Sequence, residues 1–247
     1  MPELSSPQND FRMEENFFMR EQINTTEKVK RITAVAVFAA LAYVIHFVHI
    51  PVGFLNLDFK DVVMAIAGMY FGPVAGLTLS VLVPILEFPT SETGPYGLIM
   101  NIISSTSFVL VASLIYKFKK KLWGAIVALC AAVLTMTAVM MVANLYVTPY
   151  YMGVSQAEVV ALIPRVLLPF NATKAVLNAA LTLCLYKPVT TALKKSGFGK
   201  GSATIEPEDR KKGIDIRSIL VCAIGAAIAI SALLVIFLVL GGRIAFN

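Results

Sequence analysis

The chain has 247 residues, of which 57% are hydrophobic and only 15% are charged, and its mean hydropathy is +0.77. A soluble domain needs far more polar surface, so the composition excludes one and indicates a protein that crosses the membrane several times. The formal net charge of +6 does not indicate nucleic-acid binding, because the lysines and arginines cluster beside apolar stretches, where they mark cytoplasmic ends of spans.

Residues 1–27 carry six acidic side chains and no hydrophobic stretch. We therefore expect a cytoplasmic N-terminal tail, mobile or weakly helical, and no cleavable signal peptide. The first predicted span runs from Ile32 to about Ile50 and follows three basic residues, Lys28, Lys30 and Arg31.

The first span contains two patterns of interest. Ala36 and Ala40 form a small-xxx-small pair, widened by Ala39, which lets another helix approach closely. The pattern alone leaves open whether that helix belongs to this chain or to a partner. His46 and His49 are spaced i, i+3 near the outer end, but no third ligand is nearby, so no metal site is expected.

The apolar stretch from Asp61 to Phe88 is interrupted at Gly72-Pro73. A single helix over these 28 residues would be about 42 Å long, more than one span requires. We predict two short spans with a cytoplasmic turn between them, and a re-entrant pair is the alternative. The preceding outer loop, residues 51–61, mixes apolar and charged side chains and can fold over a cavity.

Three more spans are predicted, from about Leu98 to Tyr116, from Leu122 to Tyr146 and from Ile163 to Tyr186. Residues 87–97 and 148–163 are then outer loops. The strongest cytoplasmic marker is the group of four lysines between the fourth and fifth spans, at positions 117, 119, 120 and 121.

The sixth span carries a polar stripe. Asn171, Lys174 and Asn178 are spaced i, i+3 and i+7 and share one helical face, just after Pro169, which should bend the helix. A lysine at this depth costs about 2.5 to 3.5 kcal/mol on insertion scales. The asparagines alone fit either a cavity or bonds to neighbouring helices, whereas the lysine, with no carboxylate one turn away, favours a functional cavity.

A basic cytoplasmic linker, residues 194–215, leads to a seventh apolar span in residues 216–247. With the N-terminus inside, 17 of the 21 basic residues fall on cytoplasmic segments, and the C-terminus lies outside. We therefore expect a multi-pass protein of the cell membrane.

The sequence contains no Gly-rich phosphate loop, no HExxH motif and no Ser, His and Asp set at one depth, so no enzyme activity is expected. By contrast, Asn144, the loop around Asp58, Tyr96 and Tyr150-Tyr151 all fall on the outer half, within reach of the polar stripe. This set suits a flat, partly polar small molecule better than an ion.

Four short motifs, spread over residues 28–193, resemble the substrate-binding S components of energy-coupling factor (ECF) vitamin transporters, and most closely the riboflavin-specific members. They are Asn56-Leu57-Asp58-Phe59-Lys60-Asp61, Phe71-Gly72-Pro73-Val74-Ala75-Gly76, Thr93-Gly94-Pro95-Tyr96-Gly97 and Pro169-Phe170-Asn171-Ala172-Thr173-Lys174.

The resemblance implies a six-helix bundle that binds one vitamin near the outer surface. It also implies partners, namely a transmembrane coupling subunit and two ATPase subunits that use ATP, while this chain needs no cofactor and topples in the membrane to release its cargo. In the family the alanine-rich face of the first span contacts the coupling subunit, which gives Ala36 and Ala40 that role.

The resemblance also implies ligand contacts. Asn144, Asn171 and Lys174 match the riboflavin-contacting pattern, in which amides complement the uracil-like edge of the flavin. Further expected substrate-binding residues are Leu57, Asp58, Phe59, Tyr96 and Asn178, with Phe59 or Tyr96 stacking on the ring.

Two features depart from the family, the acidic tail and the additional C-terminal transmembrane helix. Two alternatives to riboflavin capture remain open. One is an S component for another vitamin or flavin, such as FMN. The other is an ion-coupled secondary transporter, which would require inverted repeats and a membrane-embedded carboxylate.

Overall fold

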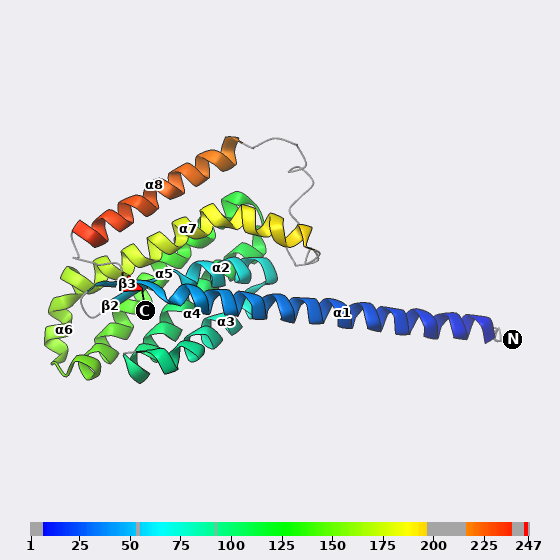
Figure 1. Cartoon of the computed structure of the whole chain (residues 1–247), viewed down its shortest axis with the longest axis horizontal. Coiled ribbons are helices and arrows are strands. Elements are labelled where there is room, and N and C mark those ends of the chain that lie inside the picture. Colours follow the sequence, from blue (N-terminus) through cyan, green and yellow to red (C-terminus); the bar gives the residue numbers. More distant parts are fainter. Residues whose placement is uncertain (1–6, 53–54, 92, 197–215, 239–244, 247) are drawn as a thin grey trace.

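The computed structural model describes residues 7–52, 55–91, 93–196, 216–238 and 245–246. Figure 1 shows a bundle of helices with a small sheet toward one end, while the N-terminal half of α1 extends alone from the other end. The elements in chain order are α1 (Pro7–His46), β1 (Val48–Val52), β2 (Leu55–Asp58), α2 (Lys60–Phe71), α3 (Pro73–Glu87), η1 (Phe88–Thr90), α4 (Gly94–Phe118), α5 (Leu122–Met152), α6 (Gln156–Leu162), η2 (Ile163–Leu167), α7 (Leu168–Lys195), α8 (Ile216–Leu238) and β3 (Ala245–Phe246).

Five helical segments in the described chain are long and apolar enough to cross a membrane: Thr25–His46, Pro73–Thr90, Gly94–Phe118, Leu122–Met152 and Gln156–Lys195. Helix α2 differs from them, because its 12 residues are all buried and would cover only about 18 Å. The first of the two short spans predicted here therefore corresponds to a short, fully buried helix. α2 is a core helix that packs against α1, α3, α4 and α7.

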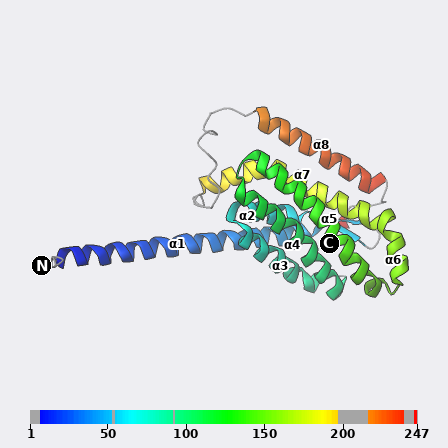
Figure 2. The same cartoon turned by 180° about the vertical axis from the view of Figure 1, so that it is seen from behind.

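Helix α1 is longer at its N-terminus, and shorter at its C-terminus, than the sequence indicated. It runs without interruption from Pro7 to His46, so the N-terminal tail continues the first membrane helix and is not weakly helical. Figure 2 shows the same extension from behind. The helix ends before the predicted boundary at Ile50, and β1 begins at Val48.

The turn between α2 and α3 depends on Gly72, whose φ of 101° is one that L side chains rarely adopt. Pro73 then opens α3 at a position where no amide hydrogen is needed. Arg31 of α1 braces the turn, since its guanidinium donates to the carbonyl oxygen of Phe71 at 2.6 Å. The predicted break at Gly72-Pro73 is confirmed, although it joins a core helix to a span.

The chain between α1 and α2 forms an antiparallel hairpin, β1 and β2, in place of the predicted outer loop. Side chains alternate between the two faces of a strand. Ile50, Val52 and Leu57 therefore face inward together and pack with Phe170 and Leu177 of α7. The C-terminal strand β3 pairs with the other edge of β1, so the sheet has the order β2-β1-β3.

The region before the polar stripe is more helical than expected. α5 extends to Met152, and α6 begins with a capping box between Ser155 and Glu158, so part of the predicted outer loop 148–163 is ordered helix. The π-helical turn η2 then precedes α7. Pro169 cannot donate to the carbonyl of Arg165, so the predicted disruption occurs here as a widened turn.

Helix α8 lies along α7 (Figure 1). Gly225 permits this close approach, because a Cβ at that position would lie 2.7 Å from Cys184 Sγ and 3.3 Å from the Ala180 carbonyl oxygen. Ala229 and Ala232 continue the contact as buried residues. The predicted linker 194–215 lies almost entirely outside the described residues.

Candidate functional site

A cavity lies beneath the β1–β2 hairpin, toward the sheet end of the bundle. Its wall is formed by the end of α1 and the hairpin, the segment around Thr90–Thr93, and helices α4, α5 and α7. Four of the predicted substrate-binding side chains line it in addition to Asp58, namely Tyr96, Asn144, Asn171 and Lys174. Residues from four separate stretches of the sequence thus meet at one site.

The two cavity asparagines are fixed by hydrogen bonds along their own helices. Asn171 donates from Nδ2 to the carbonyl oxygen of Leu167 at 2.8 Å. Asn144 donates from Nδ2 to Met140 at 2.7 Å, and its Oδ1 accepts from Thr148 at 2.9 Å. Each amide therefore has a fixed orientation at the cavity wall, which is the preorganisation that a binding site needs.

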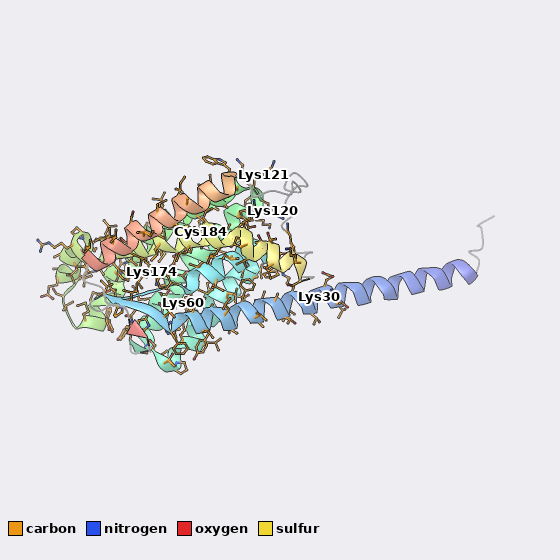
Figure 3. All side chains as sticks on the ribbon, turned by 45° about the horizontal axis from the view of Figure 1, so that its top comes forward. Lys30, Lys60, Lys120, Lys121, Lys174 and Cys184 are labelled. Carbon is orange, nitrogen blue, oxygen red and sulfur yellow. The ribbon has the colours of Figure 1, made fainter. Side chains whose placement is uncertain are left out.

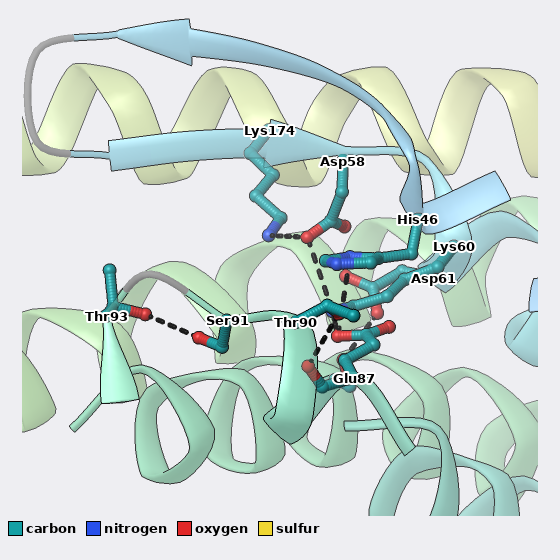
Figure 4. A network of polar contacts seen from close by, with 10 residues as sticks. His46, Asp58, Lys60, Asp61, Glu87, Thr90, Ser91, Thr93 and Lys174 are labelled. Carbon is teal, nitrogen blue, oxygen red and sulfur yellow. Dashed lines mark hydrogen bonds and ion pairs between the residues drawn. The ribbon is translucent and has the colours of Figure 1, made fainter. Parts of the chain in front are cut away.

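The ammonium group of Lys174 is paired with an acid from the hairpin. Its Nζ donates to Asp58 Oδ2 at 3.2 Å, and Lys60 Nζ lies 3.5 Å from the same oxygen. Figure 4 shows Lys174 and Asp58 meeting beneath the hairpin, with His46, Lys60, Asp61 and Glu87 next to them. Lys174 therefore has a carboxylate partner, although none lies one turn away on its own helix.

The network continues behind Asp58 into the core. Lys60 is fully buried and donates a short hydrogen bond to Glu87 Oε2, which lies 3.5 Å from His46 Nδ1. Asp61, also fully buried, accepts a hydrogen bond from Ser105 at 2.6 Å. One chain of ionisable groups thus joins α7, the hairpin, α2, α3 and α1.

The charge of Asp58 is secured by this network. Burial alone would raise the pKa of the Asp58 carboxyl, but the ammonium groups of Lys174 and Lys60 outweigh burial and lower the pKa to about 2. Asp58 is therefore ionised throughout the physiological pH range.

Three of the predicted contact residues lie outside the set of side chains that line this cavity. Leu57 is fully buried in the apolar layer between the hairpin and α7, and Phe59 packs against that layer. Asn178 is buried one turn further along α7 than Lys174, and neither its Nδ2 nor its Oδ1 has a hydrogen-bond partner among the described residues. The polar stripe is therefore only partly a cavity wall.

The sequence did not identify several lining residues, including His46, His49, Asn101 and Ser104. The pair of histidines was visible as an i, i+3 pattern, and its rings stack with centroids 6.5 Å apart. Their cavity position follows from the early end of α1, which the hydropathy of Phe47–Ile50 concealed. Within the described residues, no group of three acidic, histidine or cysteine side chains is arranged to hold a metal ion.

Comparisons with known proteins agree with this geometry. A family model described as "ECF transporter, substrate-specific component" matches residues 30–186. The chain is 30% identical over 186 residues to the riboflavin transporter RibU of Staphylococcus aureus (strain TCH60), with 71% of this chain and 98% of that protein covered. It is 27% identical over 163 residues to the riboflavin transporter FmnP of Bacillus subtilis (strain 168), with 60% and 86% covered.

This chain belongs to the family of ECF transporter substrate-specific components. A solved structure titled "Structure and mechanism of the S component of a bacterial ECF transporter" matches with a TM-score of 0.59 and 30% identity, and covers 68% of this chain and 99% of the other. The predicted fold class, an all-α membrane bundle, is thereby confirmed. The chain is the substrate-capture subunit of an ECF-type importer, and α8 lies beyond the residues that match the family.

Proposed function

We propose that this S component captures riboflavin in the cavity beneath the hairpin. The observation that carries the proposal is the meeting of Asn144, Asn171 and Lys174, from two helices and two distant parts of the sequence, at one cavity wall. The names of both relatives, which are riboflavin transporters, support the same ligand.

The cavity chemistry suits a flavin. The isoalloxazine ring carries a uracil-like edge with alternating donors and acceptors, which side-chain amides can complement, and ribityl hydroxyls suit the remaining polar groups. Tyr96 and Tyr151 line the same cavity, with ring centroids 6.5 Å apart and a 58° tilt between the rings. Tyr96 is the aromatic ring that we assign to the flavin face.

We infer that the cavity opens to the exterior and that the N-terminus is cytoplasmic. Figure 3 places Lys30, Lys120 and Lys121 toward one end of the bundle, away from Lys60 and Lys174. A concentration of basic residues at one end of the spans marks the cytoplasmic side. The cavity is at the opposite end, where a vitamin would arrive from outside.

Release into the cell would use a transmembrane coupling subunit and two ATPase subunits that supply ATP hydrolysis. The surface that we assign to the coupling subunit contains Ala36 and Ala40, which are both exposed on α1. Ala39 does not belong to this surface, because it is buried in the bundle core. A smooth exposed strip of this kind permits close helix contact and toppling against a partner.

The proposal is tested by purifying the full chain from cells supplied with riboflavin. We expect a yellow protein that releases about one riboflavin per chain on denaturation, identified by chromatography and fluorescence. The stripped protein should quench the fluorescence of added riboflavin. A colourless preparation that also fails to quench would contradict riboflavin as the ligand.

A further inference from the structure

Asp58 occupies an unusual position in the cavity wall. It is only 4% exposed, and its Oδ2 serves both Lys174 and Lys60, at 3.2 and 3.5 Å. Its other oxygen, Oδ1, is buried and has no hydrogen-bond partner among the described residues. Leaving a buried carboxylate oxygen unpaired is costly, so this atom is suited to accept a hydrogen bond from a bound molecule.

A second orphan group faces the same cavity. Ser104 of α4 is 3% exposed, lines the cavity and has an Oγ without a partner in the described chain. A hydroxyl can donate as well as accept. The wall therefore offers the ligand a hydrogen-bond acceptor, Asp58 Oδ1, and a hydroxyl that can donate or accept, Ser104 Oγ. These groups are in addition to the side-chain amides of Asn144 and Asn171.

The charges around the cavity are balanced within the protein. Among the described lining residues, the lysine and carboxylate side chains are Lys174 and Asp58, which form an ion pair. Behind them, Lys60 is held by Glu87 as well as by Asp58. A phosphate monoester entering this site would be desolvated beside an ionised carboxylate, with both nearby ammonium groups already engaged.

We propose that Asp58 determines the specificity of the site for an uncharged flavin. Its Oδ1 accepts a hydrogen bond from an N–H or O–H group of the ligand, while its charge cancels that of Lys174. Riboflavin is accepted and its 5′-phosphate, FMN, is disfavoured. This inference rests on the proposed riboflavin function. It names Asp58 as the residue that discriminates riboflavin from FMN.

The test compares the dissociation constants of riboflavin and FMN, measured by fluorescence quenching on the full chain in detergent. For Asp58→Asn we expect weaker riboflavin binding and a fall of about tenfold or more in the ratio of the FMN to the riboflavin dissociation constant. Using the ratio cancels any loss of affinity that affects both flavins equally. Asp58→Glu keeps the charge and should keep the ratio near the wild-type value.

Asp61→Asn is the matched control, because it makes the same substitution at a buried acid that does not line the cavity. Its ratio should change much less than that of Asp58→Asn. Lys174→Met should move the ratio in the opposite direction, since it removes the ammonium group that lies on the cavity wall and offsets the Asp58 charge there. This variant provides a second test if Asp58→Asn fails to fold.

Two results would overturn the inference without affecting the proposed function. One is a wild-type protein that binds FMN as tightly as riboflavin. The other is an Asp58→Asn protein in which both affinities fall by the same factor, which would make Asp58 a purely structural anchor of the hairpin. A wild-type protein that binds neither flavin would instead refute the proposed function itself.

Discussion

Lys174 and Asp58 lie 116 positions apart in the sequence, yet Lys174 Nζ donates to Asp58 Oδ2 at 3.2 Å inside the bundle. The contact joins α7 to the hairpin that covers the cavity. Lys60 of α2 lies 3.5 Å from the same carboxylate oxygen. Asp58 therefore anchors the hairpin to both α7 and α2. This ion pair both holds the β1–β2 hairpin over the cavity and balances the charge of the cavity wall.

We expect the pair to behave as an energetic unit. Asp58→Asn should lower the free energy of unfolding by about 3 to 5 kcal/mol, because it leaves the buried ammonium group of Lys174 without its carboxylate partner. Lys174→Met should cost less, because Asp58 keeps Lys60 at 3.5 Å. The double variant should lose much less than the sum, since it removes both charges. Chemical unfolding of the four proteins in mixed micelles measures this coupling, and strictly additive losses would show that the two groups act independently.

Asn171 and Asn178 provide a comparison on one face of α7. Asn171→Ala should weaken riboflavin binding by about 1 to 3 kcal/mol, because it removes an oriented polar group from the cavity wall. Asn178→Ala should leave the affinity unchanged, because Asn178 is buried away from the cavity. Fluorescence titration distinguishes the two, and equal losses in both variants would extend the binding site further along the helix.

The contrast between these asparagines indicates how far the sequence could predict the site. Spacing placed Asn171, Lys174 and Asn178 on one face, but a face of a long helix crosses several environments at different depths. Only packing decides that Asn171 lines the cavity while Asn178 is buried away from it. The sequence indicated that a lysine at this depth must be stabilised by other groups. Its partner, Asp58, lies on a hairpin that the local sequence did not predict.

For the fold, too, some features could be predicted from local sequence and others depend on tertiary packing. Hydropathy and charge located the long helices and the break at Gly72-Pro73, since these depend on local composition. The depth of α2 could not be read locally, because a buried core helix and a short membrane span are equally apolar. The hairpin was hidden for a related reason, as the apolar residues that face α7 also continue the hydropathy of the first span.

The exposed alanines of α1 are expected to affect transport without affecting capture. Ala36→Trp or Ala40→Trp should abolish riboflavin uptake by the assembled transporter while leaving the affinity of the isolated chain unchanged, because the bulky ring blocks close helix contact. Leu134→Trp on α5 is a suitable control, since Leu134 is also strongly exposed but lies on another helix. Uptake that remains normal in both alanine variants would remove this strip from the partner surface.

The contact between α8 and α7 should depend on Gly225. Gly225→Ala places a methyl group 2.7 Å from Cys184 Sγ, so the Cys184 side chain or the two helices must shift, at a cost of about 1 to 3 kcal/mol. Adding Cys184→Ala removes the obstructing sulfur and should recover most of the loss. Thermal unfolding in detergent measures both steps. A Gly225→Ala protein as stable as wild type would indicate that α8 does not pack closely here.

The pairing of β3 with β1 leads to a last prediction, on the role of the C-terminal segment. Val48 is the Cα partner of Phe246 in this antiparallel pair. Directly opposed Cα atoms lie about 4.5 to 5.5 Å apart, within the range of a disulfide. A protein carrying Val48→Cys and Phe246→Cys, with the three native cysteines replaced by alanine, should therefore cross-link on mild oxidation.

The cross-link should also slow the release of riboflavin, because β1 belongs to the hairpin over the cavity and would then be tied to the end of the chain. Stopped-flow measurement of riboflavin dissociation before and after reduction tests this effect. Val48→Cys combined with Ser196→Cys is the control, since Ser196 follows α7 at the far end of the helix from the cavity residues. Cross-linking of both pairs at equal rates would contradict the β1–β3 pairing. A cross-link that forms without changing the dissociation rate would mean that the hairpin does not move when the ligand leaves.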